Sequence, residues 1–87
     1  MAEETLVDEA FADCVLIGLG LGPRIDLGGA IQYGGWGGLY WWPVTLVFRN
    51  GSIPLDVFVK TVCAAGLSPE VVEQEIERCA EELGRSD

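Results

Sequence analysis

The stretch Arg49-Asn50-Gly51-Ser52-Ile53-Pro54 decides how this 87-residue chain folds, because a strand must end there. Asn-Gly is the strongest two-residue signal for a tight β-turn. If a hairpin closed around it, Arg49 and Ser52 would form a hydrogen-bonded pair, and Pro54 would face Val47 in the next one. Proline has no N–H to donate there, whereas it is well suited to the first turn of a helix. The sequence therefore predicts a strand before the turn and a helix after it.

The helix predicted after the turn covers about residues 54–65, and a second one follows over about 69–83. Gly66 lies where a left-handed helix cap is expected. The run Ser68-Pro69-Glu70 has the cap residue, the proline and the carboxylate that are typical of a helix start. Apolar residues at helical spacing give the second helix one buried face: Val72, Ile76, Cys79 and Leu83. The β-branched residues within 54–65 lower its helix propensity, so a strand stays open as the alternative there.

The part of the chain before the turn favours strands. Residues 39–49 are rich in aromatic and β-branched side chains and give the clearest strand, although Pro43 places it at a sheet edge or a bulge. A short strand is predicted at Ala30-Ile31-Gln32-Tyr33. Alternating apolar residues predict another over about 14–20. Thr5, with Asp8 three residues later, predicts the capped start of a helix over about 4–13.

These predictions together describe an α+β fold. We expect a small antiparallel sheet of two or three strands within about residues 14–49, an N-terminal helix, and a C-terminal helical hairpin at about 54–65 and 69–83. Eighty-seven residues give a single domain over 1–87, with no room for a second core. The hydrophobic content of 49% excludes the composition of a disordered chain.

Charge is the clearest functional signal in the composition. The chain has fourteen Asp and Glu residues, five Lys and Arg residues and no His, which gives a net charge of −9. The acids lie mainly at the two ends of the chain, on either side of a nearly neutral middle. Phosphate contacts need Lys or Arg, so direct binding to nucleic acid or to an anionic membrane is disfavoured. A partner protein with a basic surface complements this charge, although the charge could also serve solubility alone.

One set of carboxylates falls on a single face of the last predicted helix: Glu70, Glu73, Glu77 and Glu81. The set lies opposite the apolar stripe, and neighbours four residues apart are separated by about 6 Å along the axis. A row of this kind can offer a basic groove charges like those of a phosphate backbone. The region 62–76 also resembles a helix-turn-helix, with a Gly-Leu-Ser turn, but its acidic second helix would repel DNA. We expect the row to bind a protein; the alternative is an ordinary solvated helix face.

Five aromatic residues form a second candidate surface: Tyr33, Trp36, Tyr40, Trp41 and Trp42. Alternate side chains of a strand point to opposite faces of its sheet, so only some of these rings can fill the core. Exposed Tyr and Trp side chains are common at the centres of protein interfaces. We therefore expect a partner interface or a homodimer interface here. The alternatives are that the rings belong to the core, or that they form one wall of a small-ligand pocket with the nearby glycines.

The chain has few residues of the kinds that catalysis or metal binding requires. The chain has no His, its carboxylates lie in regions expected to be exposed, and no Ser or Cys has an evident base. Cys14, Cys63 and Cys79 lack metal-ligand spacing, and the last two fall on apolar helix positions, as expected for reduced thiols in the cytoplasm. The acidic start is unlike a signal peptide, and two apolar runs of about ten residues are half the length of a membrane span. We expect no enzyme activity, no metal, no cofactor and a cytoplasmic location.

The function predicted from the sequence is therefore that of a non-enzymatic acidic protein-binding module. It would inhibit a partner by occupying that partner's basic, nucleic-acid-binding surface. In general character the chain is similar to phage-encoded inhibitors of host defence, including anti-CRISPR proteins, many of which are short and acidic. A self-associating assembly protein that uses the glycine- and aromatic-rich middle, and a small-ligand binder, are the alternatives.

Overall fold

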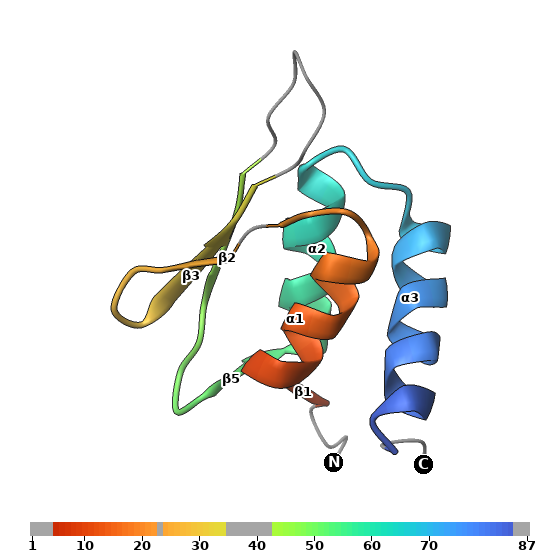
Figure 1. Ribbon diagram of the computed structural model, residues 1–87, viewed down its shortest axis with the longest axis horizontal. Helices are drawn as coiled ribbons and strands as arrows, with labels where there is room; N and C mark the ends of the chain where they lie inside the picture. The colour runs from red at the N-terminus through yellow and green to blue at the C-terminus, as the bar shows by residue number, and fades with distance from the viewer. Residues whose placement is uncertain (1–4, 23, 35–42, 85–87) are drawn as a thin grey trace.

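The computed structural model describes residues 5–22, 24–34 and 43–84. Within these ranges the chain forms three helices and two small antiparallel sheets, which confirms the predicted α+β class. The order along the chain is β1 (Leu6–Asp8), α1 (Glu9–Gly18), β2 (Arg24–Asp26), β3 (Ala30–Tyr33), β4 (Val44–Val47), β5 (Ser52–Pro54), α2 (Leu55–Ala64) and α3 (Pro69–Glu82). The sheet of β2, β3 and β4 lies on one side of α1 and α2, and α3 lies on the other side (Figure 1).

The N-terminal helix begins later and runs further than the sequence patterns predict. The predicted helix over 4–13 has the wrong bounds, and the predicted strand over 14–20 is wrong, because α1 covers 9–18. Asp8 is the N-cap in place of Thr5, and its Oδ1 accepts a hydrogen bond from the Phe11 N–H at 2.9 Å. From that start the helix buries Phe11 and Val15, four residues apart, while Ile17 is 61% exposed. A strand of period two would have buried Val15 and Ile17 together.

The predicted sheet has three strands, in the order β2-β3-β4, and lies within residues 24–47 rather than 14–49. Its inner face consists of Ile31 and Tyr33 from β3 and of Val44 and Leu46 from β4, all of them buried. A second sheet pairs β1 with β5, two short segments that the sequence analysis did not assign to strands. The pattern of alternate burial on β3 and β4 fixes which face of the larger sheet meets the helices.

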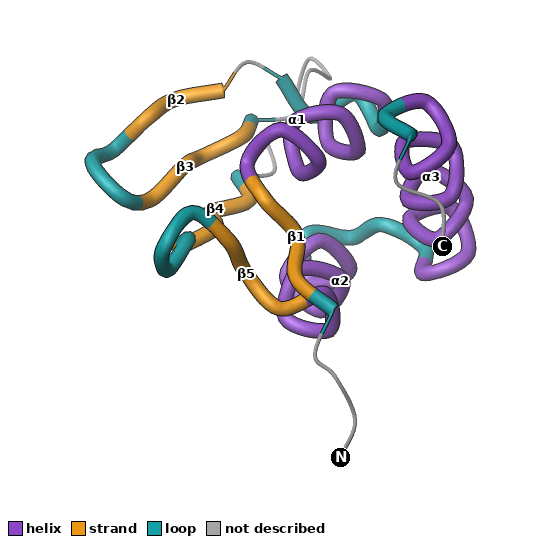
Figure 2. Tube along the Cα trace, turned by 90° about the horizontal axis from the view of Figure 1, so that it is seen from below, coloured by secondary structure: helices purple, strands orange, loops and turns teal. Residues whose placement is uncertain are grey.

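The connection between β4 and β5 forms one rung of a hairpin and then opens. Arg49 N–H donates to Ser52 O at 2.7 Å and Ser52 N–H donates to Arg49 O at 3.1 Å, around a turn at Asn50 and Gly51 with φ of 57° and 81°. Pro54 then leaves β4, and β5 runs beside β1 instead (Figure 2). The prediction that proline stops the hairpin is confirmed, and so is the helix after it, since α2 begins at the next residue.

The C-terminal helical hairpin is confirmed, with bounds within two residues of those predicted. Gly66 follows α2 with φ of 102°, as its position after a helix predicts. Ser68 is the N-cap residue of α3 by position, but its side chain makes no capping hydrogen bond. Leu83, predicted on the buried stripe, is 40% exposed because it lies just beyond the last turn of α3. Phe58 from α2 and Val72 from α3 are fully buried in the core that the helices share with the larger sheet.

We predict that Asp8→Ala lowers the free energy of unfolding by about 1 kcal/mol, because the first turn of α1 loses its side-chain cap. Urea denaturation followed by circular dichroism measures the change. Asp8→Asn keeps a side-chain acceptor at the same place and serves as the control, with most of the stability retained. An equal loss in both variants would show that the charge of Asp8, and not its capping bond, supports the helix.

Candidate functional site

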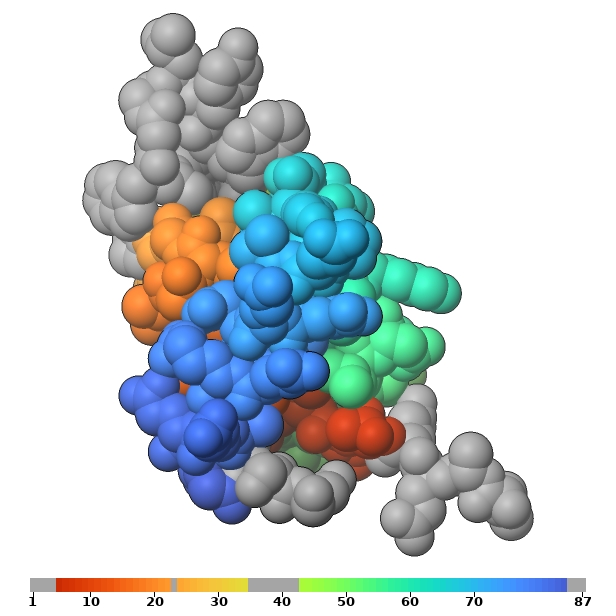
Figure 3. Space-filling view, turned by 90° about the vertical axis from the view of Figure 1, so that its right-hand side faces the viewer, coloured from red at the N-terminus to blue at the C-terminus, as the bar shows by residue number. Residues whose placement is uncertain are grey.

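The four glutamates predicted to form an acidic face lie on the outer side of α3. Glu70, Glu73, Glu77 and Glu81, called the glutamate row from here on, are all exposed. The opposite side of the helix faces the core, where Cys79 is fully buried. Figure 3 shows α3 (blue) at the front of the molecule, with much of its outer face uncovered in this view. The row is therefore accessible to a partner over about three helical turns.

The base on α3 does not neutralise the glutamate row. The Arg78 guanidinium pairs with Glu75 at 2.9 Å and with Glu82 at 2.5 Å, and both of these acids lie about 100° or more around the helix from the row. No member of the row forms an ion pair with any residue in the described part of the chain. Four negative charges therefore remain side by side on one face, at a cost of a few tenths of a kcal/mol for each neighbouring pair.

Close packing against α1 holds α3, and with it the row, in place. α1 contacts α3, and a Cβ atom added at Gly18, the last residue of α1, would meet the side-chain ends of Glu75 and Arg78. Deeper in the same contact, the buried Cys79 thiol accepts a hydrogen bond from Arg78 Nη2 at 3.4 Å. Burial, followed by interaction with the Cys14 thiol, raises the pKa of Cys79 to about 12. The thiol is therefore protonated at neutral pH and packs as a small apolar side chain, not as a nucleophile.

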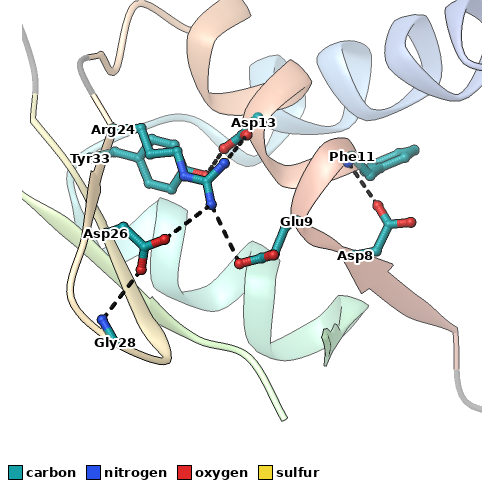
Figure 4. A network of polar contacts seen from close by, with 8 residues as sticks. All are labelled: Asp8, Glu9, Phe11, Asp13, Arg24, Asp26, Gly28 and Tyr33. Atoms are coloured by element: carbon teal, nitrogen blue, oxygen red, sulfur yellow. Dashed lines mark hydrogen bonds and ion pairs between the residues drawn. The ribbon is translucent and has the colours of Figure 1, made fainter. Parts of the chain in front are cut away.

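A second group of carboxylates lies between α1 and β2, but it is neutralised in part from within (Figure 4). Arg24 Nη1 lies 2.7 Å from Asp13 Oδ2, and Arg24 Nη2 lies 3.5 Å from Glu9 and 3.8 Å from Asp26. The guanidinium joins the helix to the edge strand β2. These N-terminal acids therefore serve an internal contact, unlike the glutamate row. Sequence patterns do not single out Arg24, because its partners Glu9 and Asp13 lie 15 and 11 residues away along the chain and only Asp26 is near it in sequence.

Tyr33, which the sequence placed among the candidate interface aromatics, lies in the core of this structure. Its side chain has no exposed surface, and its hydroxyl donates a hydrogen bond to Asp13 Oδ1. Burial, followed by this hydrogen bond, raises the pKa of Tyr33 well above its ordinary value. The other members of the set, Trp36, Tyr40, Trp41 and Trp42, lie outside the described residues. An interface at those four residues stays a prediction.

Comparison of the chain with protein-family models, with curated proteins and with solved structures finds no match to any of them. Among the described residues, no three Cys, Asp or Glu side chains are arranged as metal ligands. In the same ranges, no helix has both the length and the apolar character that crossing a bilayer requires.

We predict that the protein loses stability as the pH rises above about 9, because folding raises the pKa of Cys79 from 9.0 and that of Tyr33 from 10.0. Above these ordinary values the unfolded chain releases protons that the folded chain keeps. The stabilisation is therefore complete below the unfolded pKa values and falls as the pH rises towards the folded ones. Urea unfolding between pH 7 and about pH 11 measures this decline.

Tyr33→Phe tests the share of the decline that comes from the buried hydroxyl. The variant lacks the hydrogen bond to Asp13 and is expected to be about 2 kcal/mol less stable at pH 7, since that bond has a charged acceptor. Its stability should then fall less steeply than that of the wild type above about pH 10. A slope equal to that of the wild type would contradict a raised pKa at this residue.

Proposed function

We propose that this protein is a non-enzymatic acidic binding module that inhibits a partner protein by occupying its basic, nucleic-acid-binding surface. The observation that carries the proposal is the glutamate row, whose four carboxylates are exposed and have no basic partner among the described residues. The net charge of −9 supports it, because an acidic molecule is attracted to a basic surface before contact. The proposed partner is therefore a protein and not a nucleic acid or a membrane.

The helical spacing of the row on α3 supports this mode of binding. Successive members of the row stand about 4.5–6 Å apart along the helix axis, so a groove lined by Lys and Arg would meet regularly spaced negative charges. Carboxylates and phosphates are bound by the same charge-assisted hydrogen bonds from these side chains. Because the helix is already folded and packed on α1, little ordering of the backbone would accompany binding. Inhibition of this kind needs no catalytic group, since a filled groove cannot hold nucleic acid.

The type of inhibitor proposed is that of the short, acidic proteins that phages encode against host defence, including anti-CRISPR proteins. The likeness lies in size, acidity and the exposed carboxylates. A nucleic-acid-binding component of a bacterial defence system is the corresponding target, and such a target would be met in the cytoplasm. Excess duplex DNA should compete with the protein for this target, because both would occupy the same groove.

We predict that Glu73→Lys combined with Glu77→Lys weakens partner binding at least about tenfold at moderate salt, since each reversal replaces an attraction by a repulsion. The partner is obtained by affinity capture from a bacterial lysate at low and high salt and identified by mass spectrometry. Its affinity for each variant is then measured with the purified proteins. Circular dichroism establishes that each variant is folded.

The matched control is Asp56→Lys combined with Glu82→Lys. Both acids are exposed, one on α2 and the other on the Arg78 side of α3. Two reversals of +2 each take the net charge from −9 to −5 in either double variant, so only the position of the charges differs. An equal loss in both would show that net charge alone governs binding. If Glu73→Lys with Glu77→Lys binds the partner as tightly as the wild type, the glutamate row is not the binding surface.

A further inference from the structure

β4 and β5 separate after the rung at Arg49 and Ser52 and leave a groove between them, closed at one end by the turn. Its volume is about 540 Å³. Its lining includes Thr45, Val47 and Arg49 on one side, Ser52 and Pro54 on the other, and Val57 from α2. Figure 2 shows the cause of the opening: β4 runs with β3, while β5 runs with β1. The groove therefore lies between the free edges of two different sheets.

The β4 wall of the groove carries backbone groups that none of the described strands uses. Phe48 N–H donates to Gly29 O at 3.3 Å, so Phe48 and, by alternation, Leu46 and Val44 direct their backbone groups at β3. The N–H and C=O groups of Thr45 and Val47 then point the other way, into the groove. Outside the strand ladders, the backbone of these two residues makes no hydrogen bond to any other described residue. β4 thus offers an open edge that another strand could extend.

The β5 wall of the groove cannot pair with the open edge of β4. Pro54 faces Val47 across the groove and has no N–H to donate. Ile53, the residue before it, directs its backbone groups at Val7 of β1, as the bond from Leu55 N–H to Thr5 O at 2.9 Å shows by alternation. The two edges are therefore not mutually satisfied, and the groove stays open between them.

Two bases of this acidic protein, Arg49 in the groove lining and Lys60 on α2, have no ion pair within the described part of the chain. Lys60 lies between the groove residues Val57 and Thr61. By contrast, Arg24 and Arg78 are each surrounded by carboxylates. A carboxylate entering the groove would meet a guanidinium that no acid among the described residues already binds.

We propose that the groove binds an extended segment of a partner protein as an added strand on β4, with an acidic side chain of that segment against Arg49. The added strand would use the backbone groups of Thr45 and Val47, about 7 Å apart along β4. Its apolar side chains would cover Val47 and Val57, which are 57% and 42% exposed. This recognition is of the β-augmentation kind, in which the main chain supplies affinity and side chains supply selectivity.

Charge favours a short acidic segment over a second copy of the chain in this groove. At physiological ionic strength a charge is screened beyond about 8 Å, so Arg49, which lines the groove, acts directly on a bound segment, whereas charges farther away than this act weakly. A second copy would bring its own net charge of −9 along with its edge. The proposal makes no use of the glutamate row, which lies on α3.

The test begins with a library of random peptides of about eight residues, selected for binding to the purified protein. We expect selected peptides to be rich in β-branched residues and to contain at least one Asp or Glu. In the free protein, Thr45 and Val47 amides should exchange with solvent faster than those of Val44 and Leu46, because only the latter are paired. Bound peptide should slow the exchange of Thr45 and Val47 at least about tenfold. A library that yields no binding peptide, or a peptide that leaves these two amides unprotected, overturns the proposal.

Two changes to the protein test the contacts separately. Arg49→Gln should weaken an acidic peptide about tenfold and should leave a Gln-substituted version of that peptide almost unaffected. Val47→Pro removes one edge N–H without breaking a bond to β3, and should weaken binding about tenfold more than Val47→Ala, which keeps the N–H. If Val47→Pro does not fold, N-methylation of alternate peptide amides probes the same bonds from the ligand side.

Equal binding by the N-methylated and unmodified peptides, or no effect of Arg49→Gln, would overturn the proposal. So would a wild-type dimer in light scattering that Val47→Pro converts to a monomer, because the β4 edge would then belong to a second copy. Glu73→Lys with Glu77→Lys should leave peptide binding unchanged. Failure of the groove proposal and failure of the proposed inhibitor function are therefore distinct results.

Discussion

The missing N–H of Pro54 is the constraint on which the rest of this arrangement depends. Because this residue cannot donate to β4, the hairpin around Asn50 and Gly51 ends after a single rung, and β5 pairs through its other edge with β1. The φ of −60° and ψ of 141° at the same residue suit the position before a helix, and α2 begins immediately afterwards. One residue thus sets where the larger sheet ends, which strand forms the smaller sheet, and where the C-terminal helices start.

The two candidate surfaces follow from that arrangement and from the placement of a few charges. β1, held by β5, ends at Asp8, which caps α1, and α1 in turn supports α3. Arg24 pairs with Asp13 and so joins β2 to α1, whereas Arg78 pairs with Glu75 on its own helix. The glutamate row is among the acids that neither arginine pairs with. Arg49 forms no ion pair within the described part of the chain and lines the groove. The distribution of charge, more than its sum, therefore separates a surface suited to a basic partner from one suited to an acidic segment.

Local signals explain what could be predicted from the sequence. The Ser68-Pro69 start and the apolar spacing of α3 fix which face is exposed, so the glutamate row lies where its spacing predicts. The strand Ala30–Tyr33 and the helix after Pro54 follow in the same way. The pairing of β1 with β5 could not be predicted, because it joins residues more than forty positions apart through backbone bonds. Residues 14–18 match period two as well as a helix, and only the cap at Asp8, outside that stretch, decides between them.

The groove is harder to predict, since its binding edge consists of backbone groups of β4 that no side-chain motif marks. The sequence nevertheless indicates the open edge of β4. The tight turn at Asn50-Gly51 is followed by Pro54, which cannot donate to Val47 opposite it, so the backbone of Val47 is left unpaired by this hairpin. An exposed edge of this kind promotes aggregation unless charge, proline or a covering element protects it. Arg49 at the groove could serve such protection as well as it serves recognition, because a buried approach by an apolar strand would strip its water. An approaching strand that carries a carboxylate replaces that water with an ion pair, so the feature that rejects most strands is also the one that admits an acidic one.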